Sequence, residues 1–295
     1  MPISVNYHFT RRCNMSCGFC FHTATTSHVV QIEDAIRGIT LLKEAGMRKI
    51  NFAGGEPFLY PRFLGRLLRH CKEVGVESVS IVSNGSKVTE SFLERHGSNI
   101  DILAISCDSF DEQTNWEIGR GTGSNVRQLH RVKQWCEKFG IRFKLNTVVC
   151  RLNWMEDMNE NISALSPYRW KCFQVLIVEG ENDSAERLRD ATNFCVTSDE
   201  FEQFIEKHHG QKSLVPEPNR LMAKSYLILD EYMRFLDRTG RQPSRSILEV
   251  GVKDALESVF WDVDGFYERG GVYDWRAHLE SGNCADAGQA EILQW

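Results

Sequence analysis

The sequence has no long hydrophobic run. Its 295 residues contain no stretch of about 20 consecutive apolar residues, the length needed to cross a bilayer, so no membrane span is predicted. The first residues follow the alternation of a strand, without the charged and apolar regions of a signal peptide. These absences predict a cytoplasmic protein.

A large excess of positive charge is also missing. The formal net charge is −5, which gives no reason to expect a nucleic-acid partner. There is no low-complexity tract and no internal repeat beyond an alternation of strand and helix patterns. The hydrophobic content of 42% can fill a sizeable core, and we expect a monomer with one domain and a C-terminal extension.

Most of the cysteines lack the clustering of a disulfide framework. Seven of the ten are scattered, most of them through apolar helix or strand patterns. They are predicted to be small buried side chains in a reducing compartment. These are Cys71, Cys107, Cys136, Cys150, Cys172, Cys195 and Cys284.

The other three cysteines, Cys13, Cys17 and Cys20, stand in one short loop directly after the first strand pattern. Soft thiolates at this spacing suit an iron-sulfur cluster or zinc. Three thiolates leave one iron of a cluster open for a substrate or cofactor, whereas a closed zinc site needs a fourth protein ligand. His22 could supply that ligand, so a zinc knuckle is the alternative.

A glycine-rich segment, Gly54-Gly55-Glu56-Pro57, closes the next strand pattern. The three-cysteine spacing followed by this segment resembles the radical S-adenosylmethionine superfamily. The resemblance implies that the cysteines hold a 4Fe-4S cluster whose open iron chelates the methionine moiety of S-adenosylmethionine. It also implies that the Gly-Gly-Glu segment lies along this moiety, with glycines permitting close backbone approach.

Strand and helix patterns alternate up to residue 178. Six such units with short connections predict a parallel α/β fold, and the resemblance implies a partial (βα)6, TIM-like barrel with its chemistry at the carboxyl ends of the strands. Residues 1–180 would form the barrel core and 181–295 a helical extension and tail. The predicted strands are 3–9, 48–53, 78–82, 102–107, 142–149 and 169–178, and the helices predicted after residue 180 are 198–209, 218–237 and 246–258.

Several predicted strands place basic residues on one face and apolar residues on the other. Lys49, Lys144, Arg169 and Lys171 fall on the face opposite Ile50 and its apolar counterparts, and would point into the barrel. Unpaired charge in such a place is costly, so the pattern indicates an anionic, polyphosphate-like ligand. The alternative is that these cations pair with Glu56 or Asp108, or lie at a solvated rim.

Longer stretches resemble the viperin family, antiviral radical enzymes of vertebrates with relatives in fungi, invertebrates and prokaryotes. The resembling segments are 6–11, 17–24, 49–52, 80–85, 101–111, 118–121, 169–171, 179–182, 225–236 and 269–271. The resemblance implies dehydration of a ribonucleoside triphosphate to its 3′-deoxy-3′,4′-didehydro analogue, a chain terminator of viral RNA synthesis. The extension would then close over the nucleotide site.

The resemblance also implies roles for individual residues. Cys13, Cys17 and Cys20 would hold the cluster. The residues expected around S-adenosylmethionine are Gly54, Gly55, Glu56, Ser83, Asn84, Ser106 and Arg120. Those expected at the nucleotide are Asn6, Lys49, Lys144, Asn146, Arg169, Lys171 and Arg269.

The implied reaction begins when the reduced cluster cleaves S-adenosylmethionine to a 5′-deoxyadenosyl radical, which takes the ribose 4′ hydrogen. Loss of the 3′ hydroxyl then needs an acid, and one further electron completes the alkene. Tyr226 is the first candidate acid and Lys144 the second; without the resemblance, Tyr226 would be interpreted as a core aromatic. The electron would come from a flavodoxin-like protein or a reductase.

Two departures from the vertebrate pattern leave the base open. Thr25 and Ala53 stand where the vertebrate proteins have a lysine and a serine, so we expect a non-vertebrate member whose base is in doubt. We favour a pyrimidine substrate, either CTP or UTP, over GTP. The two pyrimidines differ by an amine versus a carbonyl, so one reversed hydrogen bond would separate them. The terminal Trp295 resembles that of family members that engage cytosolic iron-sulfur assembly machinery, although Gln294 departs from the family pattern.

Two other functions compete with this interpretation. A radical enzyme maturing a peptide or another nucleotide would usually carry a second cysteine cluster near its C-terminus, and Cys284 stands alone. A cluster-bearing antiviral protein acting through binding partners would not need a basic lumen.

Overall fold

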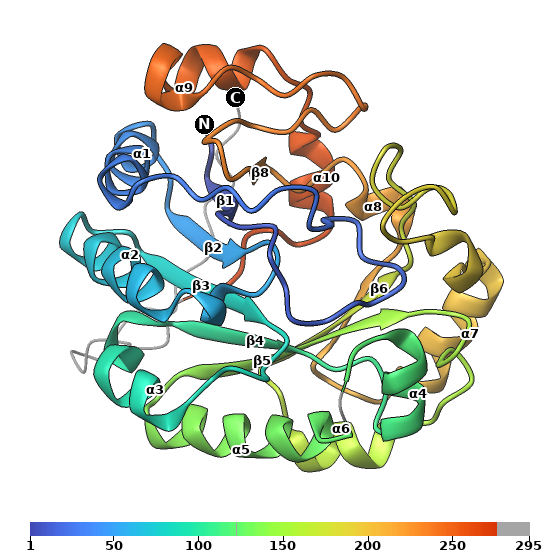
Figure 1. Ribbon diagram of the computed structural model, residues 1–295. Coiled ribbons are helices and arrows are strands. Elements are labelled where there is room, and N and C mark those ends of the chain that lie inside the picture. The colour runs from blue at the N-terminus through green and yellow to red at the C-terminus, as the bar shows by residue number, and fades with distance from the viewer. Residues whose placement is uncertain (122, 276–295) are drawn as a thin grey trace, which may run out of the picture.

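One parallel sheet organises the chain (Figure 1). The computed structural model describes residues 1–121 and 123–275. Eight strands lie in the order β7-β6-β5-β4-β3-β2-β1-β8, each pair parallel. Their bounds are β1 Ser4–His8, β2 Lys49–Ala53, β3 Ser78–Ser83, β4 Ile102–Ser106, β5 Arg142–Val149, β6 Arg169–Gln174, β7 Leu214–Glu217 and β8 Ile228–Leu229.

Helices α1–α3 and α5–α7 cover the outer, convex face of this curved sheet (Figure 1), whereas the helices α8 and α10 each contribute a residue to the cavity on its other face. Within the described residues none is long and apolar enough to cross a bilayer. Their bounds are α1 Ile32–Glu44, α2 Pro61–Glu73, α3 Glu90–His96, α4 Glu112–Ile118, α5 Asn125–Lys138, α6 Asn159–Leu165, α7 Ser198–Lys207, α8 Asn219–Met222, α9 Ile247–Glu257 and α10 Val263–Glu268, with short 3-10 turns at Pro57–Leu59, Gly97–Asn99 and Ala191–Phe194.

The alternation of side chains along each strand separates the core from the lumen. Ile50 and Phe52 of β2, with Trp170 of β6, are fully buried in the hydrophobic core beneath the helices. Lys49 and Lys171, one residue away, line a cavity on the opposite face. The period of two in a strand therefore places cations in the lumen, as the sequence predicted.

The sheet is wider than the six predicted strands. β7 and β8 add one strand to each edge, and both lie beyond residue 180. The helix predicted over 218–237 is wrong except for α8, because the apolar pair Ile228–Leu229 hydrogen-bonds to β1 as a strand. The chain then turns at Asp230, whose carboxylate accepts from the backbone N–H of Tyr232 and Arg234, each at 2.9 Å.

Candidate active site

The three-cysteine loop leaves the carboxyl end of β1 and packs against the end of α4. Ser16 and Gly18 donate backbone hydrogen bonds to the carbonyls of Gly119 and Ile118, both at 2.9 Å. Cys13 is exposed, Cys17 is buried and Cys20 is half-buried, and none forms a disulfide. Burial raises the pKa of all three thiols, so they need a bound cation to ionise; this donor set fits an iron-sulfur cluster.

His22 does not complete a zinc site with these cysteines. Its ring lies edge-on to that of His8, with 4.5 Å between centroids. In the chain as described, no group of three or more His, Cys, Asp or Glu side chains is arranged around a single metal ion. The zinc-knuckle alternative therefore finds no support in the geometry.

Two glycines let the segment after β2 lie directly against the cysteine loop. Gly55 N–H donates to the carbonyl of Thr10 and Glu56 N–H to that of Arg12, each at 2.8 Å. A Cβ at Gly55 would lie 2.0 Å from the carbonyl oxygen of Arg12, and one at Gly54 would lie 2.4 Å from that of Thr10. Glycine is therefore required here by the close approach of the protein's own backbone, in addition to the approach to the cofactor that stays a prediction of the sequence analysis.

Glu56 joins this segment to the turn after β3. One of its carboxylate oxygens accepts from Ser83 Oγ at 2.8 Å and the other from Asn84 N–H at 2.8 Å. The Asn84 side-chain amide in turn contacts Cys13 Sγ at 3.7 Å. The predicted residues Gly54, Gly55, Glu56, Ser83 and Asn84 therefore form one connected wall beside the cysteines.

Arg120 and Ser106 lie at the same end of the barrel. Arg120, which follows α4, forms an ion pair with the fully buried Asp108. Asp108 and Ser106 both line the central cavity. Because Asp108 is paired with Arg120 and also accepts from Val148 N–H at 2.9 Å, it does not compensate the lysines of the lumen.

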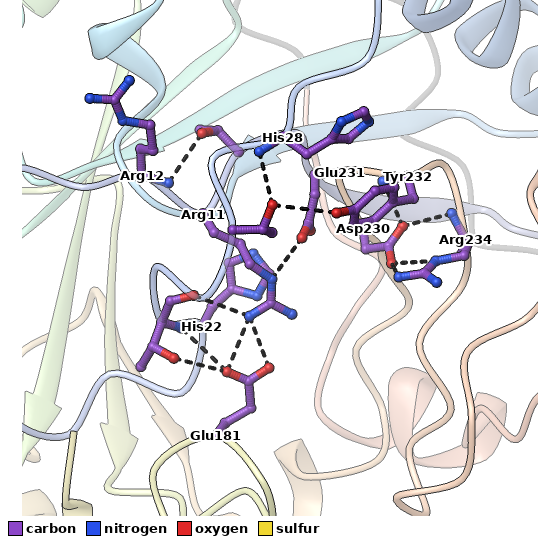
Figure 2. A network of polar contacts seen from close by, with 12 residues as sticks. Arg11, Arg12, His22, His28, Glu181, Asp230, Glu231, Tyr232 and Arg234 are labelled. Atoms are coloured by element: carbon purple, nitrogen blue, oxygen red, sulfur yellow. Dashed lines mark hydrogen bonds and ion pairs between the residues drawn. The ribbon is translucent and has the colours of Figure 1, made fainter. Parts of the chain in front are cut away.

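A buried arginine ties both ends of the cysteine loop to distant parts of the chain (Figure 2). Arg11 donates to Glu231 at 2.8 Å and to Glu181 at 2.9 and 3.1 Å. Glu181 also accepts from the hydroxyl of Thr23 at 3.2 Å. Since Arg11 precedes the first cysteine and Thr23 follows the third, Glu181 links the two ends of the loop.

A cavity of about 250 Å³ occupies the lumen below the cysteine loop. Of the predicted nucleotide residues, it is lined by Asn6, Lys49, Lys144, Asn146, Lys171 and Arg269, and Tyr226 lines it too. Arg169 does not line the cavity. Its guanidinium lies 4.1 Å from the ring centroid of Tyr273, and Tyr273 does line the cavity.

The cations of the cavity outnumber the nearby carboxylates. Five cationic side chains line it, namely Lys49, Lys144, Lys171, Arg238 and Arg269. Burial, followed by repulsion from the Lys171 charge, lowers the pKa of Lys49 to about 7. The same burial and the charges of Lys171 and Lys49 bring the pKa of Lys144 well below its ordinary value.

Glu217 of β7 is the carboxylate that the sequence analysis missed. It pairs with Lys171, and its Oε1 lies 3.7 Å from Arg269. Burial would raise the pKa of Glu217, but these two cations lower it, so the carboxylate is charged. The partners considered from sequence were Glu56 and Asp108; Glu217 gave no signal because the strand that carries it was not predicted.

Tyr226 stands at the centre of this charged group. Its hydroxyl accepts from Lys171 Nζ at 3.0 Å and donates to Glu217 at 3.2 Å. Burial raises the pKa of Tyr226, so the phenol stays protonated. The guanidinium of Arg269 lies 3.8 Å from the centre of its ring.

Tyr273 is a second tyrosine of the cavity and was not predicted. Lys49 Nζ donates to its hydroxyl at 3.4 Å, and the neighbouring Asp274 is held by Arg142 at 2.7 Å. The aperiodic tail gave no signal for these contacts. Trp295 and Cys284 lie outside the described residues.

The fold and the cysteine loop define a class of protein. Residues 7–191 match the model of the Radical SAM superfamily. The fold resembles that of Streptococcus suis SuiB bound to S-adenosylmethionine, with a TM-score of 0.67 and 16% identity over 92% of this chain and 68% of that one. It also resembles anSMEcpe with bound AdoMet, with a TM-score of 0.65 and 15% identity over 86% and 80% of the two chains. The predicted partial α/β barrel is confirmed, and the chain is a radical SAM enzyme, a class that uses a 4Fe-4S cluster and S-adenosylmethionine.

Curated relatives narrow the class to a family. The chain is 55% identical over 281 residues to the S-adenosylmethionine-dependent nucleotide dehydratase RSAD2 of Danio rerio, covering 93% of this chain and 78% of the relative. The protein of the same name from Siniperca chuatsi is 54% identical, with 93% and 79% covered, and a dehydratase from Flammeovirga pacifica is 34% identical, with 92% and 96% covered. The chain therefore belongs to the viperin family of S-adenosylmethionine-dependent nucleotide dehydratases. Since two of these relatives come from fish, the expected non-vertebrate origin finds no support.

The contact at Gly55 yields a test. We expect Gly55→Ala to lower the free energy of unfolding by about 1–3 kcal/mol, because the new methyl group must displace the backbone of the cysteine loop. Iron content after anaerobic reconstitution should fall as well. Gly210→Ala is the matched control: a Cβ there meets nothing within 4 Å, so the change should stay within about 0.5 kcal/mol. Equal iron content and stability in the two variants would contradict the assigned contact.

Proposed function

We propose that this enzyme dehydrates a pyrimidine ribonucleoside triphosphate, CTP or UTP, to its 3′-deoxy-3′,4′-didehydro analogue, an antiviral chain terminator. The printed names of the relatives support nucleotide dehydration as the reaction class. The observation that carries the choice of a triphosphate is the excess of cations over carboxylates in the cavity.

Three lysines and two arginines line the cavity, and Glu217 pairs with two of these cations. Burying charge without a partner costs several kcal/mol per ion, so a cavity built in this way favours a multiply charged anion. One polar atom of the lining, Asn146 Oδ1, is buried with no hydrogen-bond partner in the described chain. A triphosphate with its ribose would offer partners to both the charges and this atom.

We assign Cys13, Cys17 and Cys20 to the cluster. The residues that we assign to S-adenosylmethionine are those of the wall, Gly54, Gly55, Glu56, Ser83 and Asn84, together with Ser106 and Arg120. When bound, cluster and cofactor supply a 5′-deoxyadenosyl radical that takes the ribose 4′ hydrogen. The nucleotide is assigned to Asn6, Lys49, Lys144, Asn146, Arg169, Lys171 and Arg269. The ribose would then lie between the cysteine loop and the lysines.

Tyr226 is assigned as the acid that protonates the departing 3′ hydroxyl, which leaves as water. Its phenol is protonated, and its contact with Lys171 Nζ at 3.0 Å stabilises the phenolate that forms. The charged lysine can then return a proton to the phenolate. Lys144, whose pKa burial lowers well below its ordinary value, remains the second candidate.

We also propose that the segment after residue 180 closes over the nucleotide site. It supplies Glu217, Tyr226, Arg269 and Tyr273, all of which contact the lysines or the cavity. We further propose that the protein is a cytoplasmic monomer. Its electron donor would be a flavodoxin-like protein or a reductase, and Trp295 would contact the iron-sulfur assembly machinery.

Incubation of the reduced, reconstituted enzyme with each of the four ribonucleoside triphosphates tests the proposal. We expect 5′-deoxyadenosine, together with a nucleotide lighter by one water, from CTP or UTP and not from ATP or GTP, as measured by mass spectrometry. Turnover of a purine nucleotide would refute the pyrimidine assignment. Absence of a dehydrated product from all four would refute the function.

The pKa of Lys49, about 7 in the free protein, predicts a pH-dependent affinity. A bound triphosphate stabilises the charged lysine and raises its pKa, so binding takes up a proton above pH 7. Affinity should therefore fall as pH rises above 7, by up to about tenfold per unit for this single group. Calorimetry in buffers of different ionisation enthalpy measures the uptake. Lys49→Met should bind more weakly with less proton uptake, and unchanged uptake would contradict this role.

Tyr226→Phe tests the proposed acid. We expect 5′-deoxyadenosine to form while the dehydrated nucleotide decreases about 100-fold or more, the usual cost of losing a general acid. Tyr273→Phe is the matched control, because it also removes a phenol beside a lysine of the cavity and should keep the two products in ratio. A normal product ratio in Tyr226→Phe would transfer the acid role to Lys144.

A further inference from the structure

A polar hollow lies on the outer side of the cysteine loop, separate from the central cavity. Residues from the cysteine loop, the turn after β3 and the segment from the end of α4 into α5 form its walls. The lining residues are Asn14, Met15, Ser16, Asn84, Ser86, Lys87, Gly119, Gly121, Ser124, Asn125, Gln128 and Arg131. We call it the outer hollow.

One side chain separates the outer hollow from a proposed cluster ligand. Asn84 lines the hollow, and its amide contacts Cys13 Sγ at 3.7 Å. The same amide donates to Asn14 at 3.0 Å, and Asn14 donates to Ser86 at 2.9 Å. Of the three cysteines of the loop, Cys13 is the exposed one. The outer hollow therefore lies next to the exposed cysteine of the loop.

The outer hollow carries positive charge on a chain whose net charge is −5. Lys87 and Arg131 line it, and Arg12 and Arg127 are exposed on the adjoining segments. Within the described part of the chain, none of these four cations forms an ion pair and no carboxylate lines the hollow. By contrast, a second hollow between α7 and α8 is lined by Asp199, Glu202 and Glu206 with one arginine.

We propose that the outer hollow is the docking surface for an acidic one-electron carrier protein. The inference rests on the proposed function, which requires single electrons at the cluster. The carrier is oxidised by one electron, the cluster held by the cysteines is reduced by one, and no atom is transferred. Positive charge on the outer hollow attracts an acidic partner and fixes its orientation, and the hollow is lined by Asn14 and Met15, which directly follow Cys13 in the cysteine loop.

Charge reversal at Lys87 and Arg131 tests the docking surface. The holoenzyme with Lys87→Glu and Arg131→Glu is mixed with reduced flavodoxin, an acidic flavoprotein, and the second-order rate of cluster reduction is followed by stopped-flow absorbance. We expect that rate to fall roughly two- to fivefold for each reversed charge at low salt. The difference should shrink at high ionic strength, where surface charges are screened.

Two controls separate docking from other effects. Arg245→Glu with Lys253→Glu changes the net charge by the same amount near α9, which lies on the opposite side of the fold from α5 (Figure 1), and should leave the rate within twofold of wild type. Reduction by dithionite, a small anionic donor, is measured at high ionic strength, where its attraction to surface charge is screened, and should then be unchanged in both double variants. Equal slowing in the two double variants, no slowing in either, or equal slowing with dithionite would each overturn the proposal.

The test does not depend on nucleotide turnover. Cluster reduction is measured without a nucleotide, so an enzyme that dehydrates none of the four triphosphates can still show a charge-dependent rate. That combination would refute the proposed function and leave the docking surface in place. Conversely, normal dehydration of a nucleotide, combined with a rate of cluster reduction by flavodoxin that does not change in the Lys87→Glu, Arg131→Glu variant, would refute the docking surface and leave the proposed function in place.

Discussion

The positive lining of the barrel is the constraint on which the rest of the site depends. Lys49, Lys144 and Lys171 point inward because the residues beside them in the same strands fill the outer core. Burial, together with repulsion from neighbouring cations, lowers the pKa of each of these lysines, and Glu217 alone does not balance them. The folded state therefore carries an electrostatic cost that a multiply charged anion relieves, which couples substrate binding to the stability of the lumen.

The sequence predicted the lumen well because a strand alternates with a fixed period. Once Ile50 and Phe52 are assigned to the core face of the strand, Lys49 must lie on the opposite face, which lines the lumen. The same logic failed after residue 180. Two residues, Ile228 and Leu229, are too short a run to show periodicity, and they become a strand because β1 offers an unpaired edge. Glu217 stayed hidden for a similar reason, since its strand contains Pro216 and resembles a loop in sequence.

The motifs drew attention to the glycines beside the cysteine loop, and the structure adds a second physical reason for them. Gly54 and Gly55 are needed because the backbone of the loop passes within the space that a Cβ would fill. Arg11 and Glu181 add a second restraint at the opposite side, where one carboxylate contacts both ends of the loop. Long-range contacts of this kind have no local sequence pattern, which explains why sequence analysis did not find them.

These restraints give the cysteine loop two functional faces. Its inner face meets the cavity, whose buried cations would hold the proposed anion. Its outer face borders the outer hollow, where Lys87 and Arg131 are free of ion pairs within the described chain. A radical reaction needs single electrons to enter without opening the site in which the radical forms. Placing electron entry on the outer face lets the cavity stay closed during reduction, so the separation of the two faces follows from the chemistry that the family carries out.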